Sequence, residues 1–347
     1  MAAPVSPVAV DSALISVVIQ GPLCRELGQE RNILSCIASV RRHLPQARIV
    51  VSTWRGEDTA GLEVEQLVLL DDPGGLRDVS GNPVNTNRMI LSTRAGIQAA
   101  DRPYVMKLRA DHNLRSAALA VIGQPIPVAS DGLSLFDAPI TLTNLYMRDP
   151  ERVPMLFHLS DLVQFGTREA MLALWNQPLF AERELLHPGP SRNPFGNFLG
   201  YSALRMIPEQ ALLLGCLRQR GIHLTLTHPC RVRLAPLKLW DTLLTRNFTV
   251  LDHAQAGVDF PERFLAHEAV LRTLYTPHAI ARLARREGQG CRLRLLKIWV
   301  NQHLLSFTRP GWWVALASMV LFNMSPALAR RLRAGWRKAR GTGSDAG

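Results

Sequence analysis

Tyr104-Val-Met-Lys-Leu-Arg-Ala-Asp-His-Asn113 is the stretch from which the fold can be inferred. It begins as a short apolar run of strand length and ends in a cluster of polar side chains. Open α/β sheets place such polar residues at the carboxyl ends of buried strands, because their ligands bind in the crevice beyond those ends. We therefore predict a buried strand here and a ligand site where it ends.

The polar cluster is suited to a diphosphate that carries a metal ion. Asp111 and Asn113 are two residues apart, so their oxygens could meet one hard cation. Mg²⁺ or Mn²⁺ would take its other ligands from phosphate and water. Lys107 and Arg109 are cations suited to the same phosphates. The alternative is a strand that ends in a solvated turn, since Asp-x-Asn triplets are common in loops.

The preceding segments alternate between strand and helix patterns. Apolar runs at Leu14–Ile19, Ala47–Val51 and Gln66–Leu70 predict strands, the first of them buried, and each is followed by a polar turn. Asn32–His43 and Asn85–Ala100 show the spacing and end signals of helices. This order predicts an α/β fold with a mainly parallel sheet flanked by helices.

Neither G-x-x-x-x-G-K-[ST] nor G-x-G-x-x-G occurs in the chain. A nucleotide would therefore be held by residues at the strand ends instead of by a glycine-rich loop. Arg88, in the first turn of the helix at 85–100, could meet a diphosphate near the helix N-terminus. The alternative for Arg88 is a surface ion pair. The remaining candidates for nucleotide binding are Gln20, Gly21, Thr53 and Asp72. Taken singly, Gln20, Thr53 and Asp72 are better explained by ordinary turn chemistry.

In combination, five segments resemble the WavE family of lipopolysaccharide-synthesis proteins: Ile15–Leu23, Ile49–Trp54, Asp72–Gly74, Asn85–Arg88 and Lys107–Asp111. The resemblance covers roughly residues 13–265. It implies a GT-A-like, Rossmann-like fold and a glycosyltransferase activity. The donor would be a nucleotide-sugar, and the acceptor a bacterial lipopolysaccharide or another surface polysaccharide, with a lipid-linked glycan as the expected form. Asp111-His-Asn113 stands where GT-A enzymes carry Asp-x-Asp, with Asn in the third position.

The resemblance also suggests a division of the chain. Residues 1–12 are expected to be a loose lead-in, and residues 13–265 a GT-A-like domain. Within that domain, residues 13–115 would form the nucleotide-binding half and residues 116–265 the acceptor half. Residues 266–347 would form a basic, amphipathic helical tail.

Sugar transfer requires a group that takes the proton of the acceptor hydroxyl, and two carboxylates are candidates. Glu209 opens a helix after the Gly/Pro/Asn-rich loop at 189–200, which resembles the position of the base in many GT-A enzymes. The alternative is that it complements the helix dipole. Asp161, the second candidate, interrupts an otherwise apolar run at 156–166.

Farther on, the alternating residues His223–His228 predict a short strand.

The positive charge of the protein is concentrated in the tail. From Arg282 onward the chain has thirteen Lys and Arg residues and two acidic residues, which gives +11 of the formal net charge of +12. Residues 268–286 and 291–305 have helical patterns, and the apolar run at 312–322 is shorter than the roughly 20 residues that cross a bilayer. We predict an anchor on an anionic membrane surface. The alternative is a packed pair of helices with a solvated basic edge.

Cysteine usage and the N-terminus favour a cytoplasmic protein. The five cysteines are scattered, without a C-x-x-C pair, which favours a reducing compartment. The first residues lack the pattern of a secretory signal. With the predicted anchor, this places the protein peripherally on the inner face of a bacterial inner membrane.

Two other functions stay open: nucleic-acid binding through the basic tail, although no nucleic-acid-binding motif appears, and a sugar nucleotidyltransferase on a similar sheet.

Overall fold

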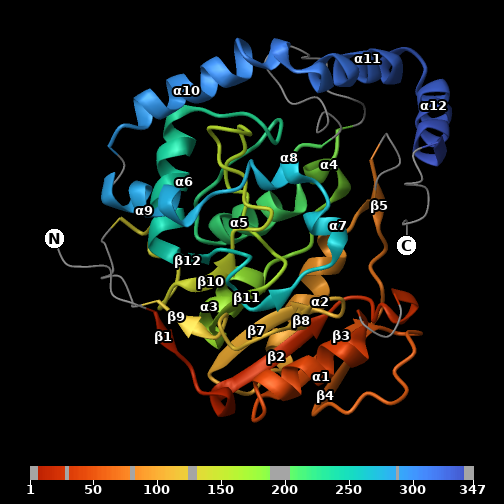
Figure 1. Cartoon of the computed structure of the whole chain (residues 1–347), viewed down its shortest axis with the longest axis vertical. Helices are drawn as coiled ribbons and strands as arrows, with labels where there is room; N and C mark the ends of the chain where they lie inside the picture. Colours follow the sequence, from red (N-terminus) through yellow and green to blue (C-terminus); the bar gives the residue numbers. More distant parts are fainter. Residues whose placement is uncertain are drawn as a thin grey trace.

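A computed structural model describes residues 7–27, 31–78, 83–123, 131–187, 204–286 and 289–339. A central sheet of seven strands carries helices on both faces (Figure 1). Six of these strands run in the same direction, and only β11 is antiparallel to its neighbours. The predicted α/β fold with a mainly parallel sheet is thereby confirmed. In spatial order the strands are β12 (Phe248–Leu251), β10 (Ile140–Thr143), β11 (Gln164–Thr167), β7 (Tyr104–Arg109), β2 (Ile15–Gln20), β3 (Arg48–Trp54) and β4 (Gln66–Leu70).

The helices described in the first 286 residues are α1 (Ile33–His43), α2 (Thr86–Ala99), α3 (Arg168–Trp175), α4 (Glu182–Leu185), α5 (Pro208–Gln219), α6 (Leu234–Asn247), α7 (Glu262–Leu265), α8 (Glu268–Leu271) and α9 (Pro277–Arg286), with the short 3-10 helices η1 (Ser12–Leu14) and η2 (Arg25–Leu27). Among them, α2 packs on β2, β3 and β4, α3 packs on β11 and β7, and α6 packs on β12, while three pairs of two-residue strands lie outside the sheet. The small strands are β1 (Val8–Ala9) with β9 (Val121–Ile122), β5 (Leu76–Arg77) with β6 (Pro83–Val84), and β8 (Asn113–Leu114) with β13 (Val258–Asp259).

Strand alternation divides the buried side chains between two cores. Successive residues of a strand point to opposite faces of the sheet. Val17 and Ile19 of β2 pack with Ile33 and Val40 of α1, whereas Val18 packs with the helices of the other face, α2 among them. The near-continuous apolar runs of the central strands follow from this, because both faces are covered.

Two predicted elements differ from the structure. Residues 223–228 form no strand, although Leu224 and Leu226 are partly buried against the core while their neighbours face outward. The alternation therefore reflects an extended segment that pairs with none of the strands in the described part of the chain. The predicted helix at 268–286 is divided into α8 and α9, because Pro277 cannot continue a helix and begins a new one.

The tail forms three longer helices, α10 (Cys291–His303), α11 (Pro310–Met324) and α12 (Pro326–Ala339), with the 3-10 helix η4 (Ser306–Thr308) between the first two. They follow one another along the rim of the molecule, and α10 packs on α6 (Figure 1). Within the residues that the structure describes, no helix combines the length and the apolar character needed to cross a membrane.

Candidate functional site

A cavity of about 330 Å³ lies at the carboxyl ends of β2, β3 and β7, where the sequence predicts a ligand site. This volume is within the usual range for small-molecule sites. Gln20 and Arg109 are register partners on β2 and β7, and both line the cavity. Trp54 lines it from the end of β3. Ends of parallel strands meet at one edge of a sheet, which explains why residues distant in sequence gather here.

Six of the predicted residues line this cavity, namely Gln20, Gly21, Asp72, Arg88, Arg109 and Asp111. Thr53 does not. It is fully buried, and strand alternation directs its side chain to the face opposite Gln20 and Trp54. Trp54, the next residue, takes the place at the cavity that the sequence interpretation gave to Thr53.

Lys107 is also outside the cavity lining. It points to the same face of the sheet as Arg109 but lies two residues before the end of β7. Its ammonium group is fully buried, donates to the backbone carbonyl of Asp161 and lies 5.1 Å from the centre of the Trp175 ring. Burial lowers the pKa of Lys107 to about 8. Lys107 therefore connects β7 to the segment that carries Asp161 instead of facing a phosphate.

Helix α2 supplies the wall of the cavity opposite β7. It packs closely on β2 because Gly96 has no side chain, since a Cβ there would lie 2.3 Å from Cγ1 of Val18. One turn earlier, the hydroxyl of Ser92 donates to the side-chain oxygen of Gln20 at 2.6 Å. The glycine thus sets the distance at which α2 fixes the Gln20 amide beside the cavity.

Arg88 and Asp72 form an ion pair at the outer end of the cavity. The guanidinium of Arg88, in the first turn of α2, donates from Nε to Oδ1 of Asp72 at 2.7 Å and from Nη2 to Oδ2. This hydrogen bond holds the pKa of Asp72 below its usual value. Both side chains are about one-third exposed.

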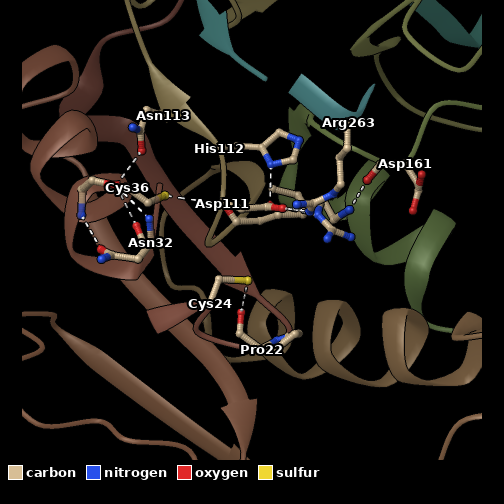
Figure 2. A network of polar contacts seen from close by, with 12 residues as sticks. Pro22, Cys24, Asn32, Cys36, Asp111, His112, Asn113, Asp161 and Arg263 are labelled. Carbon is tan, nitrogen blue, oxygen red and sulfur yellow. Dashed lines mark hydrogen bonds and ion pairs between the residues drawn. The ribbon is translucent and has the colours of Figure 1, made fainter. Parts of the chain in front are cut away.

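Asp111 is held by three partners at the inner end of the cavity (Figure 2). Its Oδ1 accepts from Nε of Arg109 at 3.1 Å and lies 2.7 Å from Nδ1 of His112, while Oδ2 accepts from Arg263. Burial acts to raise the pKa of Asp111, but the bond to His112 and the charge of Arg109 outweigh it. The pKa of this carboxyl is therefore well below its usual range.

Asn113 points away from Asp111 (Figure 2). Its side-chain oxygen accepts from the hydroxyl of Ser35 on α1 at 3.2 Å. The reason is the turn after β7, which places Asn113 on β8, opposite Asp259 of β13. The predicted metal pair therefore does not converge on one point, and both oxygens of Asp111 already accept from other groups, an arrangement that does not fit one cation held by both residues. Nor does the described part of the chain gather three His, Cys, Asp or Glu side chains suited to a metal ion.

Helix α7 contributes two residues that sequence analysis did not identify. Arg263 binds Asp111 although 152 residues separate them in sequence. Phe264 packs edge-on against Tyr146 and at a tilt against His112, with the guanidinium groups of Arg109 and Arg263 5.8 and 4.8 Å from its ring centre. The segment Pro261-Glu-Arg-Phe264 has the signature of a helix start, but nothing in the sequence shows where that helix lies.

The two predicted catalytic carboxylates are neighbours. Glu209 lies in the first turn of α5 with 17% of its side chain exposed, and Asp161 is buried. Burial, reinforced by the negative charge of Asp161, raises the pKa of Glu209 to about 8. A carboxyl group with such a pKa can accept a proton near neutral pH and hold it.

His158 is oriented toward Glu209, with its Nε2 4.0 Å from Oε2 of the carboxyl. The backbone N–H of Arg148 donates to Nδ1 of His158 at 3.2 Å, so the proton of the neutral ring is on Nε2. Burial and the charge of Arg148 lower the pKa of His158 to about 3, which keeps the ring neutral. Tyr146 and Phe157 have φ values of 67° and 60°, a left-handed conformation that is strained and uncommon for bulky residues.

The acidic pair and the cavity are connected through the residues between them. Lys107 bonds the backbone of Asp161, and Arg109, two residues farther along β7, lines the cavity. Phe264 connects Arg109 to Tyr146, whose pKa is raised by burial and is also sensitive to the charge of Glu209. The geometry thus combines a strand-end cavity, arginine cations and a high-pKa carboxyl group.

Comparison with known proteins gives one informative match. No curated protein matches the chain. The family model described as WavE lipopolysaccharide synthesis matches residues 15–336. This match reaches well past residue 265, where the resemblance in the sequence ends, and includes most of the basic tail. Because it covers nearly the whole chain, the protein belongs to the WavE lipopolysaccharide synthesis family.

Proposed function

We propose that the protein is a glycosyltransferase that moves a sugar from a nucleotide-sugar to a lipopolysaccharide or other surface-polysaccharide acceptor. The observation that carries this assignment is the strand-end cavity lined by Arg109 and Asp111, with the acidic pair close enough that the charge of Asp161 acts on Arg109. The family membership supports a role in lipopolysaccharide synthesis. The mainly parallel sheet, with its cavity at the carboxyl edge, supports the GT-A-like fold that the sequence resemblance implies.

The cavity suggests an orientation for the donor. Trp54 at the end of β3 offers an aromatic face to the nucleobase, and the Arg88–Asp72 pair borders the same end. At the other end, Arg109 lines the cavity and could bind the diphosphate. Arg263 is not among the lining residues, but it meets Arg109 at Asp111 and could reach the same phosphates. The sugar would then extend toward Asp161 and Glu209.

The chemistry follows from these placements. Glu209 takes the proton of an acceptor hydroxyl, whose oxygen forms a bond to the anomeric carbon of the donor sugar. The bond between that carbon and the diphosphate breaks, and its electron pair stays on the diphosphate oxygen. Arg109 and Arg263 stabilise the negative charge that develops there. His158 presents its Nε2–H toward Glu209 and helps to orient the carboxyl.

Arginine cations can compensate the charge of the diphosphate in this scheme. Asp111 acts as the group that holds Arg109 and Arg263 in place, because both of its oxygens accept hydrogen bonds from neighbouring side chains. The Mg²⁺ or Mn²⁺ ion inferred from the sequence stays a prediction, and no step above depends on it.

Replacing Arg109 by Met should weaken donor binding by about 10- to 100-fold, because hydrogen bonds to charged groups contribute about 1.5–3 kcal/mol. Calorimetric titration with UDP-, GDP- and CMP-sugars, each with EDTA and with Mn²⁺, measures this effect. Arg115→Met is the matched control, since Arg115 pairs with Asp259 and is 71% exposed outside the cavity. A wild-type protein that binds none of these donors would overturn the assignment, as would equal affinities of the two variants.

A further inference from the structure

Helix α10 departs from the pattern of an ordinary surface helix, because it buries polar side chains and exposes several large apolar ones. Its inward face carries Arg294 and Gln302, which are 4% and 8% exposed, beside the apolar Cys291 and Ile298. Its outward face carries Leu293, Leu296 and Trp299, which are 59%, 55% and 49% exposed. A helix at the surface of a soluble protein normally buries its apolar stripe and exposes its charges. The outward face of α10 is therefore suited to an apolar environment.

The inward arginine is fixed by a buried network, so the orientation of α10 is well determined. Arg294 bonds Asp241 of α6, lies 3.3 Å from a carboxylate oxygen of Glu151 and donates to the hydroxyl of Tyr275 at 3.0 Å. Rotating the helix to bury its leucines would expose this network and leave Asp241 without its partner. Such a loss is costly for a buried ion pair.

The apolar surface continues beyond α10. Of the nineteen large apolar side chains that are exposed in the described residues, twelve lie between Leu293 and Leu332. On α11, Trp313, Val314 and Met324 are 55%, 67% and 80% exposed. We call the outward apolar side chains of residues 293–332 the tail surface. Exposed apolar surface concentrated in this way marks a site that contacts a partner or a membrane.

The charge of the same region limits what that partner can be. Residues 288–344 contain ten Lys and Arg residues and no acidic residue. Arg292 and Lys297 are exposed beside the leucines of α10, and Arg330 and Arg331 are exposed on α12. Long basic side chains can cover apolar surface with their methylene groups and place their charges at a lipid headgroup. The partner must therefore be apolar and anionic.

We propose that the tail surface docks on an anionic lipid bilayer, with Leu296, Trp313 and Met324 in the acyl boundary and the basic residues at the headgroups. A second copy of the chain would bring the exposed basic residues of the two tails, Arg292, Arg330 and Arg331 among them, against one another. A nucleic acid would pair with the basic residues but would leave the exposed leucines and tryptophans in water. This membrane docking is independent of the proposed glycosyltransferase activity.

Co-sedimentation of the full-length protein with phosphatidylcholine vesicles, with and without phosphatidylglycerol, tests this docking. The wild type should bind the anionic vesicles, and binding should weaken as salt increases. The variant Leu296→Glu/Trp313→Glu/Met324→Glu should lose about tenfold or more in affinity. A control of equal charge, Val8→Glu/Leu34→Glu/Leu67→Glu, changes exposed apolar residues outside the tail and should bind as the wild type does. Replacing Arg330 or Arg331 by Gln should cost about fivefold each.

Three results would overturn the proposal. The first is equal loss of vesicle binding in the tail variant and the control of equal charge. The second is a wild-type dimer in solution that the tail variant converts to a monomer, because the tail surface would then bind a second copy. The third is a wild-type protein that does not bind anionic vesicles but binds duplex DNA or RNA in a salt-sensitive way, with the same affinity for the nucleic acid in the tail variant.

Discussion

Replacing Glu209 by Gln should lower the rate of sugar transfer by about 10²–10⁴-fold, the usual contribution of a general base. Binding of the nucleotide-sugar should be unchanged, because Glu209 is not among the residues that line the donor cavity. Transfer of a radiolabelled sugar to a lipopolysaccharide preparation measures the rate, and calorimetry measures donor binding. Glu169→Gln is the matched control, since Glu169 is an exposed carboxylate in the first turn of α3.

The pH dependence of transfer gives a second readout for Glu209. A general base works in its unprotonated form, so the rate should rise with pH up to about 8, where burial and Asp161 place the pKa of Glu209. Asp161→Asn removes the neighbouring charge and should move the midpoint of this rise to lower pH. An E209Q variant with the wild-type rate would exclude Glu209 as the base. If D161N alone were inactive, the second candidate, Asp161, would take that role.

Protein stability should also report the raised pKa of Glu209. The folded protein binds this proton up to about pH 8, whereas the unfolded chain releases it near the ordinary value of 4.5. Between these two values the folded state binds more protons, so the free energy of unfolding should fall as pH rises. E209Q should lack this decrease, and urea denaturation of both proteins across this pH range measures the difference. Equal slopes would contradict a raised pKa.

The order of strands and helices could be predicted from the sequence because each buried strand is a short apolar run with a polar end. The same pattern located the cavity, since parallel strands place their carboxyl ends at one edge. It could not select the residue at each strand end that faces the ligand. Thr53 and Trp54 are adjacent, and only the pairing of β3 decides which of them lines the cavity. A displacement of one residue changes the face of the sheet.

Contacts that form only through tertiary packing could not be predicted from the sequence, for a different reason. Arg263 reaches Asp111 through the packing of α7, and no periodicity connects segments so far apart in the chain. Asn113 follows the same strand as Asp111, yet the turn after β7 directs it to Ser35. Glu209 and Asp161 were each identified separately. Their proximity depends on how α5 packs against the segment before β11, where the side chain of Gln210 donates to the backbone carbonyl of Leu156.

Replacing Asp111 by Ala should destabilise the protein by about 3 kcal/mol. Removing one partner of a buried ion pair costs about 3–5 kcal/mol, and the lower end applies because Arg109 and Arg263 are 31% and 43% exposed. Urea denaturation measures this loss as a lower midpoint at an unchanged m-value. Glu268→Ala, which breaks an exposed pair with Arg272, should change the midpoint little.

The destabilisation should depend on pH in a direction set by the lowered pKa of Asp111. The carboxylate contributes its full stability above the ordinary value for Asp, about 4, and this contribution is lost as pH falls toward the lower pKa of the folded state. The difference between wild type and D111A should therefore be constant from neutral pH down to about 4 and shrink below it. A difference that instead grows in acid would contradict the ion-pair network around Asp111.

The same variant distinguishes an arginine-held site from a metal site. If Asp111 positions Arg109 and Arg263, D111A should lose donor affinity equally in EDTA and in Mn²⁺, and Arg263→Met should reproduce part of that loss. The effects of D111A and R263M on stability should be non-additive, because the two residues are in contact. If D111A instead kept wild-type stability and lost only the donor affinity that Mn²⁺ adds, the carboxylate would be a metal ligand. The arginines would then have to move away from it when the donor binds.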